Sequence, residues 1–154
     1  MSSEKEIVNY WYNKKGFFTI NNIKTSTNKD AGILALRFEK GAVEEILHIG
    51  VSCSITNNIT ETAKLDKSIR DIVDGKFEDK GIKEAISSNT EQFNIQKSRL
   101  RKIIVIGSVP KSRRKEIIEE FNEKDVEVLE LENILFEVME QLDTRYYRND
   151  IIRT

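Results

Sequence analysis

The sequence contains one cysteine, one proline and one histidine among its 154 residues. A lone cysteine cannot close an internal disulfide, which excludes a disulfide-held scaffold and is typical of a reducing compartment. One proline in a chain with 33% charged residues argues against a loop-rich fold and favours helices with solvated outer faces. We therefore expect a domain held together by its own apolar core.

Long hydrophobic runs are also missing. No apolar stretch approaches the roughly 18 residues that a membrane-spanning helix needs. The first residues, MSSEKEIVNYW, do not show the basic-then-apolar pattern of a signal peptide. An apolar fraction of 38% is enough for one core without metal or disulfide. The sequence thus predicts a single domain spanning residues 1–154, cytoplasmic and with no membrane partner.

The formal net charge of −1 hides a strong asymmetry. Residues 97–115 include eight basic residues and no acid, whereas residues 116–143 include eleven acids against one base. A near-neutral total does not exclude a nucleic-acid partner, because the local field decides the attraction. A solvated helix face beside a solvated loop would explain the same pattern, and the sequence leaves both interpretations open.

Helical and strand signals alternate in the first third of the chain. Ser3 and Glu6 have the spacing of a capping box, which predicts a helix to about Lys15 with Gly16 as its stop. Residues 17–20 are β-prone, and the polar residues 21–30 indicate an exposed loop. We expect Trp11 and the pair at 17–18, both phenylalanine, to lie in the core.

Two further strands are predicted at 32–38 and 43–55, joined by a turn at 39–41. A period of two in the second places positions 49, 51, 53 and 55 on an apolar face, and 48, 50, 52 and 54 on a small, polar face. Cys53 is therefore expected to be a core residue.

The rest of the chain predicts helices near 65–73 and 82–86, then a buried strand at 103–107. Pro110 lies near the start of a further helix, where its missing N–H costs little. A strand at 126–131 and a helix capped by Asn133 follow, and residues 145–154 are ambiguous. The order, α–β–β–β–α(α)–β–α–β–α, predicts an α/β fold with a three-strand meander followed by a βαβ unit of parallel strands.

Three segments resemble the PD-(D/E)XK nuclease superfamily, particularly its archaeal Holliday-junction-resolvase-like and restriction-endonuclease-like members. They are WYNKKGFFT at 11–19, DAGILA at 30–35 and HIGVSCS at 48–54. The motifs cover residues 4–55, and the remainder agrees in element order alone. The resemblance implies a restriction-endonuclease-like core, in which a mixed central sheet (helix, three-strand meander, then βαβ) is flanked by helices.

The resemblance places the family's metal-binding Asp, Glu and Lys at Gly32, Gly50 and Ser52. In that chemistry carboxylates hold Mg²⁺, which activates water and stabilises the charge developing on phosphate. Glycine supplies no ligand, and serine supplies neither charge nor a useful base. We therefore expect no intact catalytic residue, no metal and no cofactor, and a hollow, uncharged pocket along these three positions.

A relocated metal site is the alternative. Asp30 lies two residues before Gly32, about 6–7 Å along the same strand face, and His48 has the same relation to Gly50. Glu6 lies near the place where many relatives keep an accessory glutamate. These three residues would make an active Mg²⁺-dependent endonuclease. Structural roles compete: Glu6 fits the capping box, Asp30 ends a polar loop, and His48 fits a strand edge.

A phosphate-binding role is also predicted. Residues 107–112 follow a strand and open a helix, where N–H groups and the helix dipole can hold a backbone phosphate, although the pattern of a nucleotide-binding P-loop is missing. The candidate nucleic-acid contacts are Lys14, Lys15, Lys97, Arg99, Arg101, Lys111, Arg113 and Arg114.

The function expected from the sequence is that of a catalytically inactive nuclease-like domain. It would bind DNA, duplex or branched, or serve as a structural subunit of a nucleic-acid-processing assembly. We expect it to act as a homodimer or as a heteromer with a related subunit. A pure protein-interaction module, with the acidic C-terminal helices as its interface, is a second alternative.

Overall fold

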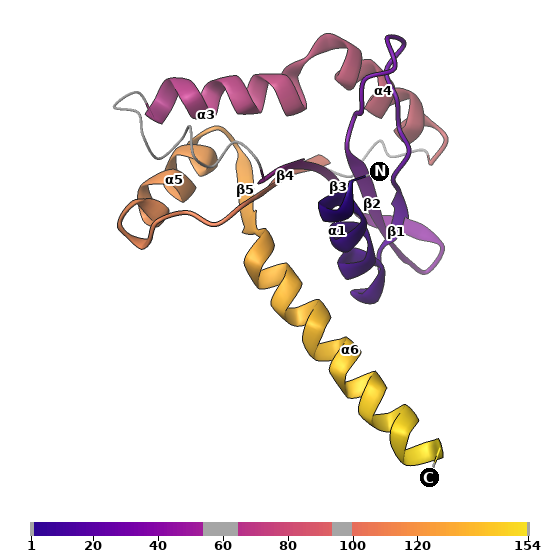
Figure 1. The fold of residues 1–154 in the computed structure, drawn as a ribbon. Coiled ribbons are helices and arrows are strands. Elements are labelled where there is room, and N and C mark those ends of the chain that lie inside the picture. Colours follow the sequence, from indigo (N-terminus) through magenta and orange to yellow (C-terminus); the bar gives the residue numbers. More distant parts are fainter. Residues whose placement is uncertain (1, 54–64, 94–99, 154) are drawn as a thin grey trace.

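The fold, a computed structural model, is described for residues 2–53, 65–93 and 100–153, with the backbone alone for 143–153 (Figure 1). The elements alternate in the order that the sequence predicts. They are α1 (Ser3–Lys14), β1 (Phe18–Ile20), β2 (Ile33–Glu39), β3 (Ala42–Ser52), α3 (Leu65–Val73), the short π-helical segment η2 (Asp74–Glu78), α4 (Lys80–Glu91), β4 (Leu100–Ile106), α5 (Lys111–Glu123), β5 (Val126–Glu130) and α6 (Leu131–Arg153).

The five strands form one mixed sheet in the order β1-β2-β3-β4-β5. Strands β1, β2 and β3 make an antiparallel meander, with Ile33 opposite Ile49. Strands β3, β4 and β5 are parallel, with Gly50 opposite Ile104. The predicted meander followed by a parallel βαβ unit is therefore confirmed, and the chain is an α/β fold with a mixed sheet flanked by helices.

Helices cover both faces of this sheet (Figure 1). On one face, Leu47 and Ile49 of β3 pack with Val8 of α1 and Ile134 of α6. The opposite face is covered by α3, η2, α4 and α5. The alternation predicted for β3 is confirmed at positions 48–51, because Ile49 and Val51 face α1 and α6, whereas His48 and Gly50 face Phe77 in the second layer.

Strand β4 lies in the middle of the core, as its continuous apolar run predicts. Ile103 and Val105 pack toward α1 and α6, whereas Ile104 and Ile106 pack toward α3 and α5. Each of the four is at most 4% exposed. A strand buried on both faces needs no polar alternation, which explains its run of β-branched residues.

Two predicted helix caps are wrong by one or more residues. The hydroxyl of Ser2, not of Ser3, accepts the Lys5 backbone N–H at 3.2 Å and caps α1. Helix α6 begins at Leu131, so Asn133 lies inside its first turn, where its side-chain amide donates to Glu130 at 3.4 Å.

Some core assignments are also corrected. Phe17 is buried, but Phe18 is 55% exposed, because it lies on β1, a three-residue strand at the edge of the sheet. Trp11 is half-buried against the core of α1 and α6. Strand β3 ends at Ser52 rather than at 55, so Cys53 lies just beyond it and is half-buried. Residues 54 and 55 lie outside the described residues.

Across the described ranges, no helix has both the length and the apolar character needed to cross a bilayer.

Candidate functional site

Gly32 directly precedes β2, and Gly50 lies near the end of β3, where the two antiparallel strands are neighbours. Each glycine fits closely against a neighbouring residue. Gly32 has a φ of +96°, and a Cβ atom there would lie 2.5 Å from the carbonyl oxygen of Ile49. At Gly50 a Cβ atom would lie 3.3 Å from the Cβ of Lys76 and 3.4 Å from the ring of Phe77. Both glycines therefore have a packing role, and a longer side chain at position 50 would meet the Phe77 ring.

The hollow pocket predicted on this face of β3 is thus wrong at Gly50. Phe77, which is 2% exposed, fills that space from η2. Its ring also makes an edge-to-face contact with His48, at 5.0 Å between centroids. The π-helical segment places an aromatic ring where the resemblance implies a carboxylate.

His48 is buried and has a structural partner. Its Nε2 atom lies 2.7 Å from the carbonyl oxygen of Ala31. Because a carbonyl oxygen only accepts, Nε2 carries the proton and donates this hydrogen bond. The pKa of His48 is lowered to about 4, chiefly by burial and also by the charge of Lys102. The hydrogen bond to Ala31 acts in the opposite direction but is the weaker effect. The imidazole is therefore neutral near pH 7.

Asp30 forms an ion pair, although its side chain is 47% exposed. Its Oδ1 atom accepts from Lys5 Nζ at 2.7 Å and from the Gly32 backbone N–H at 3.0 Å. Burial acts to raise the pKa of this carboxyl, but the bonds from Lys5 and Gly32 and the charge of Lys24 outweigh it, so the pKa is lowered. Asp30 stays ionised and holds Lys5, whose side chain is only 8% exposed.

The other candidate residues of this region lie apart from Asp30 or lack charge. Glu6 is exposed on α1, whereas the neighbouring Lys5 is buried. Ser52 is buried, and its hydroxyl has no hydrogen-bond partner among the described residues. Over the same residues, no three His, Cys, Asp or Glu side chains are grouped so that they could hold a metal ion.

A small pocket of about 60 Å³ opens beside the Lys5–Asp30 pair. Its lining joins the start of α1, the end of the 21–32 loop, β3 and η2, and consists of Ser2, Lys5, Asp30, Ala31, Gly32, Val51 and Lys76. Two lysines against one aspartate give these walls a net charge of +1. The pocket therefore attracts anions rather than cations.

Two more lysines extend this positive region onto the surface. Lys24 and Lys29 lie on the exposed loop between β1 and β2, and Lys24 pairs with Asp30 in an isolated β-bridge. Lys29 Nζ lies 3.9 Å from Asp79. We call Lys5, Lys24, Lys29 and Lys76 the lysine cluster.

The charges of the lysine cluster act on one another across the pocket. Burial lowers the pKa of Lys76, while the charge of Asp30 raises it and the charges of Lys29 and Lys5 lower it. Four lysines against Asp30 and Asp79 leave a net charge of +2. This concentration of positive charge has no single sequence signal, because its members come from α1, a loop and η2.

The basic residues predicted from the sequence lie elsewhere, and several are paired with acids. Arg101 binds Glu127 through two nitrogens, at 2.8 and 2.7 Å, and Glu45 at 3.1 Å. Arg114 lies 3.0 Å from Glu130, and Arg113 lies 3.5 Å from Glu116. The acidic stretch thus folds back on the basic stretch, and much of the asymmetry of the sequence cancels.

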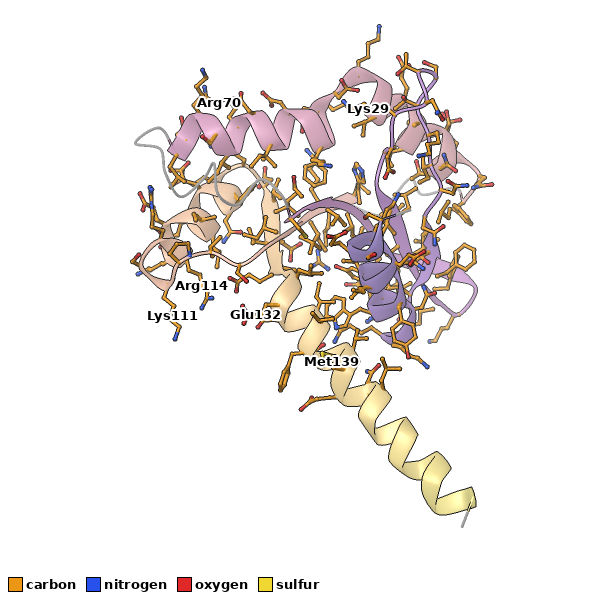
Figure 2. The ribbon with its side chains drawn as sticks, in the orientation of Figure 1. Lys29, Arg70, Lys111, Arg114, Glu132 and Met139 are labelled. Atoms are coloured by element: carbon orange, nitrogen blue, oxygen red, sulfur yellow. The ribbon has the colours of Figure 1, made fainter. Side chains whose placement is uncertain are left out.

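Five basic candidates remain, of which three lie among the described residues. Lys14 lies over the ring of Tyr10, and Lys15 lies over Trp11 and 3.8 Å from Glu137. Lys111 is exposed at the start of α5, and Figure 2 shows it beside Arg114, well away from Lys29. Lys97 and Arg99 lie outside the described residues. The candidates that the structure describes are therefore distributed over the end of α1, β4 and the start of α5.

Comparison of the chain with protein-family models, with curated proteins and with solved structures finds no match.

Proposed function

We propose that this chain is a non-cleaving, restriction-endonuclease-like domain that binds the phosphate backbone of nucleic acid at the lysine cluster. One observation carries the proposal. The resemblance implies metal-binding carboxylates at the start of β2 and the end of β3. The charged side chains that line the pocket there are Lys5, Lys76 and Asp30, which is already paired with Lys5.

The chemistry of this pocket suits phosphate better than it suits Mg²⁺. Mg²⁺ is bound through carboxylates and other oxygen ligands, and it keeps several waters. Here one carboxylate is already neutralised by Lys5, and a second lysine stands beside it. Ammonium groups make charge-assisted hydrogen bonds to phosphate oxygens and need no metal to do so. The pocket can therefore hold a phosphate group without the means to hydrolyse it.

A polymer backbone is favoured over a small phosphate compound by the shape of the charged surface. The pocket itself is small, at about 60 Å³, and has room for little more than one phosphate group. Lys24 and Lys29 continue the positive charge along an exposed loop. Duplex DNA carries one negative charge per roughly 1.7 Å of its axis, so lysines on the pocket and on the loop can engage more than one phosphate.

The test is binding to a 30-base-pair duplex and to a four-way junction. Fluorescence anisotropy measures the affinity for each DNA over a series of KCl concentrations. We expect binding that weakens steeply with salt, and a log–log salt slope that falls by about 1 for each phosphate contact removed. Lys76→Met and Lys5→Met should each bind more weakly than the parent chain and show this smaller salt slope. Lys115→Met, an exposed position on α5, is the matched control for charge alone.

Two results would reject the proposal. One is the absence of binding at low salt; the other is equal affinity for Lys76→Met and Lys115→Met. A loss caused by Lys111→Met alone would move the contact to the start of α5, as the sequence pattern suggested.

A cleavage assay separates the proposal from its catalytic alternative. We expect plasmid and junction DNA to stay intact with Mg²⁺ or Mn²⁺. Cleavage that disappears in Asp30→Ala would instead establish an active endonuclease with relocated ligands at Glu6, Asp30 and His48.

A further inference from the structure

The carboxylate of Asp30 lies in the pocket as an anion bound to two donors. Its Oδ1 atom accepts from the ammonium group of Lys5 at 2.7 Å and from the backbone N–H of Gly32 at 3.0 Å. Lysine ammonium groups and backbone N–H groups are also the donors that proteins offer to phosphate oxygens. Asp30 therefore holds two donors that a bound phosphate would use.

Lys5 needs an anion beside it. Its side chain is only 8% exposed, and a buried ammonium group without a partner destabilises a fold. Lys76 lines the same pocket and is itself half-buried. An anion that replaces Asp30 would thus keep Lys5 paired and would meet a second ammonium group.

The side chain of Asp30 can leave while its backbone stays in place. It is the exposed member of the ion pair, at 47%. The backbone of Asp30 pairs with Lys24 in a β-bridge. On the other side, the Ala31 N–H donates to the carbonyl oxygen of Ile23 at 3.0 Å, and the Ala31 carbonyl oxygen accepts from His48. Rotation of one side chain to another rotamer therefore frees both donors without moving the loop.

We propose that Asp30 is an internal competitor for the anion site, and that a backbone phosphate of nucleic acid displaces its carboxylate from Lys5 and Gly32. The inference rests on the proposed function, because it concerns the regulation of the same pocket. The displaced carboxylate turns to solvent, and the phosphate meets Lys5, Lys76 and the Gly32 N–H. An anion has to bind these donors more strongly than a carboxylate does, so the contact excludes weakly held anions and lowers the affinity for nucleic acid.

The first test is the affinity of Asp30→Asn for the same duplex, by fluorescence anisotropy. Asparagine keeps an oxygen that can accept the Gly32 N–H, but it removes the charge that holds Lys5. We expect binding about tenfold tighter than that of the parent chain, since a hydrogen bond between charged groups corresponds to about that factor.

The matched control is Glu123→Gln, which removes an exposed carboxylate near the end of α5. At about 150 mM KCl, where charges are screened beyond roughly 8 Å, it should change the affinity by less than about twofold. Circular dichroism checks that each variant is folded. Asp30→Ala, which removes the acceptor as well as the charge, should gain at least as much affinity as Asp30→Asn.

A double-mutant cycle separates displacement from a general effect of charge. In a Lys5→Met background Asp30 has lost the ammonium group that it withholds, so Asp30→Asn should raise the affinity by about twofold at most. Equal gains with and without Lys5 would mean that Asp30 acts on phosphate from a distance, and the inference would be wrong.

Inorganic phosphate gives a second measurement without DNA. In chloride, Asp30→Asn should unfold at a lower temperature than the parent chain, because Lys5 is left buried without a charged partner. Differential scanning fluorimetry at constant ionic strength should then show a larger phosphate-dependent rise in Tm for Asp30→Asn than for the parent.

The outcomes distinguish this inference from the proposed function. If Asp30→Asn binds the duplex and responds to phosphate as the parent chain does, the inference is overturned while the proposed function stands. If neither protein binds the duplex at low salt, the proposed function is rejected and the inference with it.

Discussion

Phe77 and His48 form a packed unit with Gly50 at the end of β3 that resembles neither a metal site nor an open cleft. The aromatic ring lies against the imidazole on one side and above the glycine on the other. The imidazole in turn holds the chain just before β2 through Ala31. A ring that is almost fully buried contributes on the order of 2–3 kcal/mol by leaving water, so this unit stabilises the fold.

The buried imidazole makes stability depend on pH. The pKa of His48 is about 4 in the folded chain and about 6.5 when unfolded, so between these values the unfolded state binds more protons. Stability is fully present above pH 6.5 and is lost as the pH falls toward 4, by roughly 3 kcal/mol in total. We expect urea midpoints, measured every half pH unit, to fall across this window.

The matched variant is His48→Gln, whose side chain stays neutral and keeps an N–H donor. Its urea midpoint should be lower overall but nearly flat between pH 6.5 and 4.5. Carboxylates with lowered pKa values, such as Asp30 and Glu78, lose their contribution at lower pH and do not mimic this slope. A parent protein equally stable at pH 6.5 and 4.5 would contradict the assignment.

At the scale of single elements, the first turn of α1 offers a direct test of its cap. The Ser2 hydroxyl satisfies the backbone N–H of Lys5, whereas Ser3 is the first residue inside the helix. Ser2→Ala should destabilise the chain by about 1 kcal/mol, the usual effect of losing a serine cap. Ser3→Ala should change the unfolding free energy by much less, and chemical denaturation of both variants decides which serine is the cap.

Most elements could be predicted from the sequence because their periodicity is strong. The apolar run at 103–106 and the alternation that begins at His48 each fit one kind of strand, and the predicted strands end within three residues of the observed ones. Caps were less certain, because Ser2 and Ser3 are adjacent and Glu6 lies at the spacing that favours the wrong one. Segment η2 has no pattern of its own, since its register depends on Phe77 packing against β3.

The candidate site could not be predicted in the same way. Lys5, Lys24, Lys29 and Lys76 are separated by up to 71 positions (76 − 5) and meet only in the tertiary structure. The basic stretch that did stand out in the sequence lies beside acids once the chain is folded, as Arg101 does beside Glu127. Local composition cannot foresee such pairing, because it depends on which strands become neighbours.

On the scale of the whole molecule, binding of an anion at the lysine cluster should stabilise the fold, because the pocket joins four separate parts of the chain. A ligand that binds only the folded state adds RT ln(1 + [L]/Kd) to the free energy of unfolding. With a phosphate Kd of about 1 mM, 20 mM phosphate adds about 1.8 kcal/mol, or about 4–7 °C in Tm for a domain of this size. Differential scanning fluorimetry at constant ionic strength measures this shift against chloride.

Phosphate and sulfate also stabilise proteins in general through exclusion from the surface, so the difference between variants carries the prediction. Lys76→Met should lose most of the phosphate-dependent shift, whereas Lys115→Met should keep it. The shift should saturate with phosphate concentration, since a single pocket fills, while the exclusion effect keeps growing. Equal, unsaturated shifts in all three proteins would mean that the lysine cluster binds no phosphate.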